Sequence, residues 1–213
     1  QLKLKSYAIL ASLVNLILYQ YPFFKFVLTT SNSKSISGIM LLISLIVAAI
    51  VLNAFVFYIV LYLLRNVGKW LLSIIFNISA IAVYFINSYG IIIDRTMIGN
   101  VFNTNYEESS SFFSFGLILY IVFLGLLPSF FLFKFQIVRP KLKSFLIHTG
   151  LTLVFLGILV FANSTNWLWI DKNSKTLGGL VMPWSYVVNT SRYYSHINKK
   201  NKKQILLPDA TIK

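Results

Sequence analysis

The chain has 213 residues, of which 57% are hydrophobic and 16% aromatic, and its mean hydropathy is +0.76. A soluble domain of this length is far less apolar, so the composition places the chain in a lipid bilayer. The formal net charge is +14, but the basic residues are scattered along membrane borders, which favours anionic lipid headgroups over nucleic acid as partners. The absence of cysteine excludes disulfides and thiolate metal sites.

Five segments are apolar over roughly the 20 residues that a membrane-spanning helix needs. They cover residues 7–24, 38–64, 70–89, 115–133 and 145–170. We therefore predict an all-α membrane protein whose first domain, residues 1–170, contains five transmembrane helices. Pro22 is expected to close the first span, and Pro128 to kink the fourth unless the carbonyl that it leaves unpaired finds a neighbour.

The basic residues of the short loops all fall on one side of the membrane if the first residue is cytoplasmic. They are Lys3, Lys5, Arg65, Lys69, Lys134, Arg139, Lys141 and Lys143. The positive-inside rule then predicts a cytoplasmic N-terminus in a bacterial inner membrane. Because five spans put the termini on opposite faces, the C-terminus is predicted to be periplasmic.

A polar loop, residues 90–114, separates the third and fourth spans and holds three of the five acidic residues. Asp94 or Thr96 can cap a helix there. We predict a short helix at the periplasmic interface, with one side sunk toward the acyl chains. That apolar side consists of Met97, Ile98, Val101 and Phe102.

On a continuous helix, Asn100, Thr104 and Glu108 would form one row at positions i, i+4 and i+8. The row offers an amide, a hydroxyl and one fixed negative charge to water or to a lipid headgroup. Spacing alone favours the simpler interpretation that the row is the solvent-exposed face of an ordinary amphipathic connector.

The other polar residues of the sequence do not indicate catalysis or transport by this chain. Four asparagines in the spans are expected to hydrogen-bond neighbouring helices; they are Asn15, Asn53, Asn77 and Asn87. No charged residue sits at mid-span, which disfavours an ion-coupled transporter. His148 and His196 are expected on opposite faces, so they cannot share a metal ion, and no serine or threonine is attended by a basic partner.

Residues 171–213 are polar, basic and aromatic, and we predict a periplasmic bridging segment that lies on the membrane surface. The cluster Lys199–Lys203 is expected to be solvated or to face headgroups. Because the sequence stops at residue 213 with nothing compact after the bridge, we expect the chain to be the membrane part of a longer protein.

The pattern Tyr89-Gly90-Ile-Ile-Ile-Asp94-x-x-Met97-Ile98-x-Asn100-Val101-x-x-Thr104-x-x-x-Glu108 resembles the periplasmic loop of the bacterial phosphoethanolamine transferases that modify lipid A and related surface glycans. The loop stands between the third and fourth of five spans, as in that family. A weaker resemblance follows the fifth span, at Asn173-x-Lys175 and then Pro183 and Tyr186. Asp171 stands where the family usually has an arginine.

The resemblance implies that a soluble domain with zinc and a threonine nucleophile, which has no counterpart here, performs the transfer. This chain alone is therefore expected to be inactive. The implied donor is phosphatidylethanolamine and the implied acceptor lipid A. Glu108 would pair with the donor's ammonium group, while Asn100 and Thr104 would hydrogen-bond its phosphate or ethanolamine. The alternative is a non-enzymatic lipid-binding scaffold or a transporter subunit.

Overall fold

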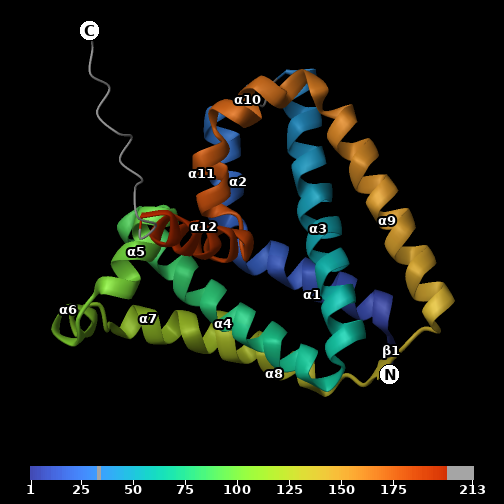
Figure 1. Ribbon diagram of the computed structural model, residues 1–213, viewed down its shortest axis with the longest axis horizontal. Coiled ribbons are helices and arrows are strands. Elements are labelled where there is room, and N and C mark those ends of the chain that lie inside the picture. The colour runs from blue at the N-terminus through green and yellow to red at the C-terminus, as the bar shows by residue number, and fades with distance from the viewer. Residues whose placement is uncertain (33–34, 201–213) are drawn as a thin grey trace, which may run out of the picture.

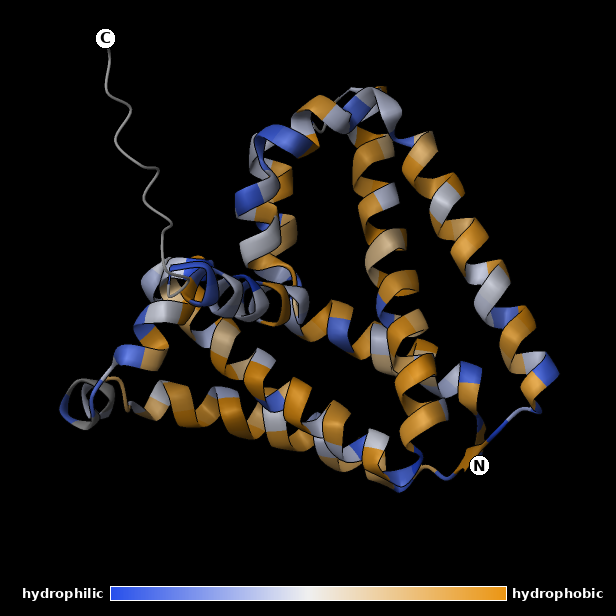
Figure 2. Cartoon of the chain, viewed as in Figure 1, coloured by the Kyte–Doolittle hydropathy of each residue, from blue (hydrophilic) through white to orange (hydrophobic). Residues whose placement is uncertain are grey.

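The computed structural model describes residues 1–32 and 35–200, and most of them are helical (Figure 1). Four helical segments are long and apolar enough to cross a membrane: α3 (Ile36–Leu64), α4 (Asn66–Tyr89), Phe115–Lys134 and α9 (Leu142–Ala162). A fifth candidate consists of α1 (Leu4–Tyr19) and α2 (Tyr21–Thr30) taken together. Apolar residues dominate these helices, and hydrophilic residues gather at the connections (Figure 2). The prediction of an all-α, multi-pass membrane protein is confirmed.

The first span differs from the prediction, because the chain bends by 63° between α1 and α2 and does not end near Pro22. Pro22 lies in the first turn of α2. A proline is tolerated there, since the backbone N–H groups of a first turn have no intrahelical acceptor. The helix therefore resumes after Gln20 and continues to Thr30.

The fourth span contains a π-helical stretch just before Pro128. It runs through α7 (Phe115–Tyr120), the π-helix η1 (Ile121–Leu126) and α8 (Leu127–Lys134). Proline has no N–H for the carbonyl of Leu124, four residues earlier, and the Tyr19 hydroxyl donates to that carbonyl instead. The expected neighbour for the freed carbonyl is thus a tyrosine from α1.

All four asparagines of the spans hydrogen-bond to residues on other helices or segments, as predicted. Asn77 of α4 donates to the Ser129 hydroxyl on α8, at 3.2 Å, and Asn87 donates to the Tyr120 hydroxyl, at 3.3 Å. The close approach at Asn77 requires Gly125, because a Cβ added there would lie 2.5 Å from Asn77 Oδ1. Asn15 and Asn53 belong to the cluster described next.

The bend at Gln20 is held by a cluster that we name the buried junction, formed by Asn15, Gln20, Asn53, Met182 and Trp184. Gln20 Nε2 donates to Asn15 Oδ1 at 3.0 Å and to the carbonyl of Met182, whose N–H donates back to Gln20 Oε1 at 3.3 Å. Asn53 donates to the same Asn15 oxygen at 3.0 Å, and the Trp184 indole donates to Asn53 at 2.9 Å. The junction therefore ties α1, α2 and α3 to the segment after the last span.

The N-terminal residues lie beside the connection that follows α8. The strand β1 (Leu2–Lys3) pairs in parallel with β2 (Ile137–Val138). Tyr7 donates to the carbonyl of Leu132 at 2.6 Å, and Lys69 donates to that of Phe135 at 2.6 Å. Basic residues from the N-terminus, from α4 and from the connection after β2 are thereby gathered at one end of the bundle (Figure 1).

The last predicted span corresponds to α9, which ends at Ala162 and not at the predicted Ile170. The amide of Asn163 donates to the carbonyl of Leu159 at 3.0 Å, and Asn166 is bonded by the hydroxyl of Ser37 at 2.8 Å. These polar contacts turn the chain into η2 (Ser164–Asn166) and α10 (Trp167–Lys172). The predicted bridging segment then forms α11 (Ser174–Leu180) and α12 (Trp184–Lys200), and residues 201–213 lie outside the described part.

Candidate functional site

The predicted interfacial loop begins where α4 ends at Gly90, which has a left-handed backbone with φ 66°. Glycine adopts this conformation without a Cβ penalty, so it is a favourable end for the helix. The helix α5 (Arg95–Asn103) follows, and Asp94 caps it by accepting the Met97 N–H at 2.9 Å. Of the two predicted capping residues, Asp94 and not Thr96 is therefore the cap.

The row Asn100, Thr104 and Glu108 does not lie on one continuous helix. α5 ends at Asn103, Thr104 has an extended backbone, and α6 (Tyr106–Ser111) carries Glu108. The Thr104 N–H and hydroxyl both donate to the Asn100 carbonyl, at 2.9 and 2.7 Å. Asn100 and Thr104 are thus adjacent, with Asn100 exposed and Thr104 half-buried. The side chain of Glu108 lies outside the described part.

The predicted apolar side of α5 is divided between the protein interior and the surface. Ile98 is buried and Met97 packs against the core, whereas Val101 and Phe102 are 57% and 52% exposed. Phe102 stacks on Tyr193 of α12 with ring centroids 5.5 Å apart. The helix α5 therefore contacts α12 as well as the bundle.

A glycine of α5 lies against an aromatic ring of α12 where the two helices cross. A Cβ added to Gly99 would lie 3.0 Å from Cε2 of Tyr193, so the ring would have to shift slightly to admit a larger residue. Asn189 of α12 donates to the carbonyl of Ile93 at 2.8 Å, and the Ile93 N–H donates to the carbonyl of Gly179 at 3.1 Å. The loop before α5 is thereby held between α11 and α12.

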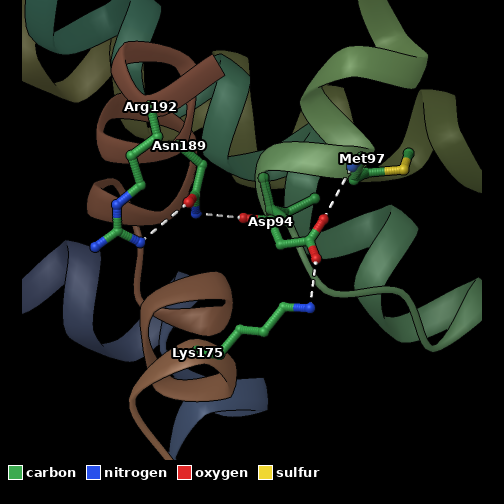
Figure 3. A network of polar contacts seen from close by, with 6 residues as sticks. Asp94, Met97, Lys175, Asn189 and Arg192 are labelled. Carbon is green, nitrogen blue, oxygen red and sulfur yellow. Dashed lines mark hydrogen bonds and ion pairs between the residues drawn. The ribbon is translucent and has the colours of Figure 1, made fainter. Parts of the chain in front are cut away.

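Four polar side chains at this crossing form what we name the polar junction: Asp94, Lys175, Asn189 and Arg192 (Figure 3). Lys175 Nζ lies 3.3 Å from Asp94 Oδ2, with the lysine side chain 83% and the aspartate 21% exposed. Arg192 donates to Asn189 Oδ1 at 3.4 Å. Side chains from three separate segments therefore meet at the start of α5.

The pKa of Asp94 is shifted by opposing influences. Partial burial alone would raise it, but the backbone N–H of Met97 and the ammonium group of Lys175 together favour the charged form more strongly. The pKa of the Asp94 carboxyl is consequently lowered below its usual value. Asp94 is therefore an anion at neutral pH and can serve both as helix cap and as ion-pair partner.

A pocket of about 550 Å³ opens at the polar junction. Its lining residues are Asp94, Arg95, Thr96, Lys175, Asn189, Ser191, Arg192, Ser195, His196 and Lys199. Four of these are lysine or arginine and one is acidic, so the pocket has an excess of positive charge. Thr96 is one helical turn from Asn100, and the pocket wall therefore leads toward the predicted row.

The polar junction was only partly predictable from the sequence. Asp94 and Lys175 stood in the two stretches that carried the family resemblance, whereas no pattern indicated Asn189 or Arg192. Both lie on α12, and they reach the start of α5 only because that helix folds back across α5 at Gly99.

The residues that the structure describes do not form a zinc site. Within the described ranges, 1–32 and 35–200, no group of three or more histidine, aspartate or glutamate side chains is arranged to hold a metal ion. His148 lies on α9, where its Nδ1 is 2.6 Å from the carbonyl of Ser144, and His196 lies on α12. No chemical step is therefore assigned to a metal held by this chain.

The fold and the site together define a multi-pass helical membrane domain. In it, the short helix α5 packs against α12, the helix that follows the last span. The model of the phosphoethanolamine transferase EptA/EptB family matches residues 50–197. The chain belongs to this family.

Two curated relatives and one solved structure show how much of such proteins the chain represents. It is 32% identical over 185 residues to the phosphoethanolamine transferase EptA of Helicobacter pylori, covering 86% of this chain and 34% of that protein. It is 31% identical over 105 residues to the phosphatidylethanolamine transferase Mcr-2 of Escherichia coli, covering 49% of this chain and 20% of that protein.

The solved structure is the integral membrane lipooligosaccharide phosphoethanolamine transferase A (EptA) from Neisseria meningitidis. It matches with a TM-score of 0.78 and 21% identity over 92% of this chain and 37% of that one. This likeness shows the fold. The chain spans about a third of the length of its fuller matches, the relative from Helicobacter pylori and this structure.

Proposed function

We propose that this chain is the membrane domain of a phosphoethanolamine transferase of the bacterial inner membrane, with a cytoplasmic N-terminus and a periplasmic C-terminus. It anchors the enzyme and presents the phosphatidylethanolamine headgroup to a zinc-dependent periplasmic catalytic domain outside this chain. The proposed acceptor is lipid A. The observation that carries the proposal is that α5 lies beside a polar pocket and packs against α12. We name residues 94–108, which include α5, the α5 segment.

A zwitterionic headgroup needs groups of both signs, and the α5 segment is suited to supply them. The exposed amide of Asn100 and the oxygen of Thr104 can hydrogen-bond the phosphate or the ethanolamine. The carboxylate of Glu108 pairs with the ammonium group. The excess of positive charge in the neighbouring pocket favours the phosphate on the same side of the helix.

The position of α12 explains how binding would be coupled to transfer. This helix contacts α5 through Tyr193 and then continues toward the C-terminal end of the chain. A headgroup held at α5 would therefore lie close to the connection with the catalytic domain. Holding two reactants in place converts an encounter across the membrane surface into a local one, which lowers the entropic part of the barrier.

The experiment is Glu108→Gln in the full-length enzyme, with Glu107→Gln as matched control. Both variants remove one acid from α6, but Glu107 does not belong to the predicted row. A charge-assisted hydrogen bond is worth about 1.5 to 3 kcal/mol, so transfer should fall roughly tenfold or more in Glu108→Gln only. Equal amounts of each variant in the membrane fraction verify insertion. Unchanged turnover of Glu108→Gln dismisses the assignment.

A further inference from the structure

A second feature lies away from α5, where residues of α1, α3 and α9 line a common cleft. The cleft has a volume of about 530 Å³, and its lining is mostly apolar side chains of the three helices, among them Ile9, Val51, Phe55, Leu151 and Phe155. None of the nine residues of the buried and polar junctions lines this cleft. Within a bilayer, such a cleft favours a hydrocarbon chain as its occupant.

A smaller pocket of about 310 Å³ adjoins the cleft and has the opposite character. The two share Lys5, Tyr58 and His148 in their linings, so they adjoin at these residues, and together we name them the combined space. The smaller pocket adds Lys3 and Arg139 to its lining. One end of the combined space is thus apolar and the other is cationic.

The fold itself brings the cations together. Pairing of β1 with β2 sets Lys3 opposite Val138, the residue before Arg139, and Lys5 follows in the first turn of α1. No acidic side chain lines either pocket among the described residues. In the part of the chain that the structure describes, the one ion pair is that of Lys175 with Asp94, so these three cations have no protein counter-charge.

The helix α9 also leaves room for an occupant. It is anchored at one end by Phe145, which stacks on Tyr62 and Tyr58 with ring centroids 3.8 and 5.3 Å away. Just beyond its other end, Asn166 is bonded to Ser37 at the start of α3. Phe145 is its only buried residue, so the stretch between these anchors has little protein against it.

We propose that this combined space binds one anionic glycerophospholipid, with an acyl chain in the cleft between α9, α1 and α3 and its phosphate at Lys3, Lys5 and Arg139. Three cations without an acid attract a net negative headgroup and repel the ammonium of a zwitterionic one. The acyl chain supplies packing that α9 lacks. The site is separate from the α5 segment and does not depend on the proposed transfer.

The test measures lipid preference of the full-length protein in phosphatidylcholine vesicles that contain spin-labelled phosphatidylglycerol or spin-labelled phosphatidylcholine. The immobilised fraction of each label gives the preference. The double variant Lys5→Gln, Arg139→Gln should lower the preference for phosphatidylglycerol about tenfold. The matched control Lys141→Gln, Lys143→Gln removes the same charge from residues that line neither pocket, and it should keep the preference.

A second variant tests the cleft without changing charge. Ala54 lines the apolar part, and Ala54→Phe should fill it and reduce the immobilised fraction of the phosphatidylglycerol label. Inorganic phosphate is the competitor that separates a lipid from a free anion, and it should leave that fraction unchanged at equal ionic strength. Equal immobilisation of both labels in the unmodified protein, equal loss in both double variants, or displacement by inorganic phosphate would overturn the proposal.

Discussion

At the buried junction α12 is held by hydrogen bonds among amides that solvent does not reach, whereas at the polar junction it is held by charged groups in contact with water. Asn15, Gln20 and Asn53 are each at most 1% exposed. By contrast, the side chain of Lys175 is 83% exposed although it forms an ion pair. The two junctions thus use the same kinds of polar contact in very different surroundings.

The surroundings decide what each contact is worth. A polar group buried away from water and left unpaired costs about 1 to 3 kcal/mol, because nothing replaces the lost partner. An exposed ion pair is worth about 0 to 1 kcal/mol, because water solvates both charges once they separate. We therefore expect the buried junction to maintain the architecture and the polar junction to rearrange at a lower cost.

The largest effect is expected from Gln20→Leu, which removes the centre of the buried junction. The backbone N–H and carbonyl of Met182 both lose their side-chain partner, and each group left unpaired costs about 1 to 3 kcal/mol. The unfolding temperature in detergent should fall clearly. Gln136→Leu, at an exposed glutamine, is the control and should change it little. Equal shifts would contradict the assigned role of the buried junction.

A smaller loss is expected from Trp184→Phe. The substitution keeps an aromatic ring but removes the N–H that donates to Asn53 Oδ1, at a cost of about 1 kcal/mol. Trp167→Phe is the comparison, because the indole of that exposed residue donates to the carbonyl of Val160 at 3.2 Å. Thermal unfolding should distinguish the pair. A larger fall in unfolding temperature for Trp167→Phe than for Trp184→Phe would contradict the prediction that the more buried hydrogen bond is worth more.

At the polar junction, Asp94→Ala should loosen α5 without unfolding the domain. It removes the cap at Met97, worth about 1 kcal/mol, together with the ion pair to Lys175. Hydrogen exchange of the α5 amides should become faster, while the unfolding temperature changes less than in Gln20→Leu. Asp94→Asn retains a capping oxygen and should show a smaller increase. If hydrogen exchange of α5 is unchanged in both variants, Asp94 does not stabilise the start of α5.

The smallest expected effect is a dependence on acid. Because the pKa of Asp94 is lowered in the folded protein, its contribution to stability is fully present above the ordinary aspartate pKa of about 4 and is lost as the pH falls through the lower folded pKa. The protection of the α5 amides, which is the slowing of their exchange relative to the intrinsic rate at the same pH, should fall in the unmodified protein below about pH 4. In Asp94→Asn this loss of protection should be smaller, and equal acid responses would contradict the assignment.

Several features of this protein were predictable from local sequence. The apolar stretches gave the membrane helices because burying about 20 residues in lipid is a property of the segment itself. Asp94 preceded a helix whose free N–H groups it can cap. The asparagines of the spans had to find partners, since an unpaired amide in lipid is costly.

Features that depend on distant partners were not predictable. The bend after α1 is stabilised by Gln20 contacts to Met182, which is 162 positions away in the sequence. The proposed headgroup row is interrupted at Thr104, where the backbone is extended, and the regular spacing of the row did not indicate this break. The end of α9 at Ala162 was hidden because apolar residues resume at Trp167, directly after the short polar run 163–166.

The sequence by itself determined that this chain is a helical membrane protein with a polar segment between its third and fourth spans. Hydrophobicity and capping act over one helix and need no knowledge of the rest of the molecule. Only the tertiary structure decided that α12 folds back on α5, and that a pocket opens at the polar junction and an apolar cleft between α9, α1 and α3. Hydrogen bonds and charges choose their partners by distance in space, and that distance is known only once the helices have packed.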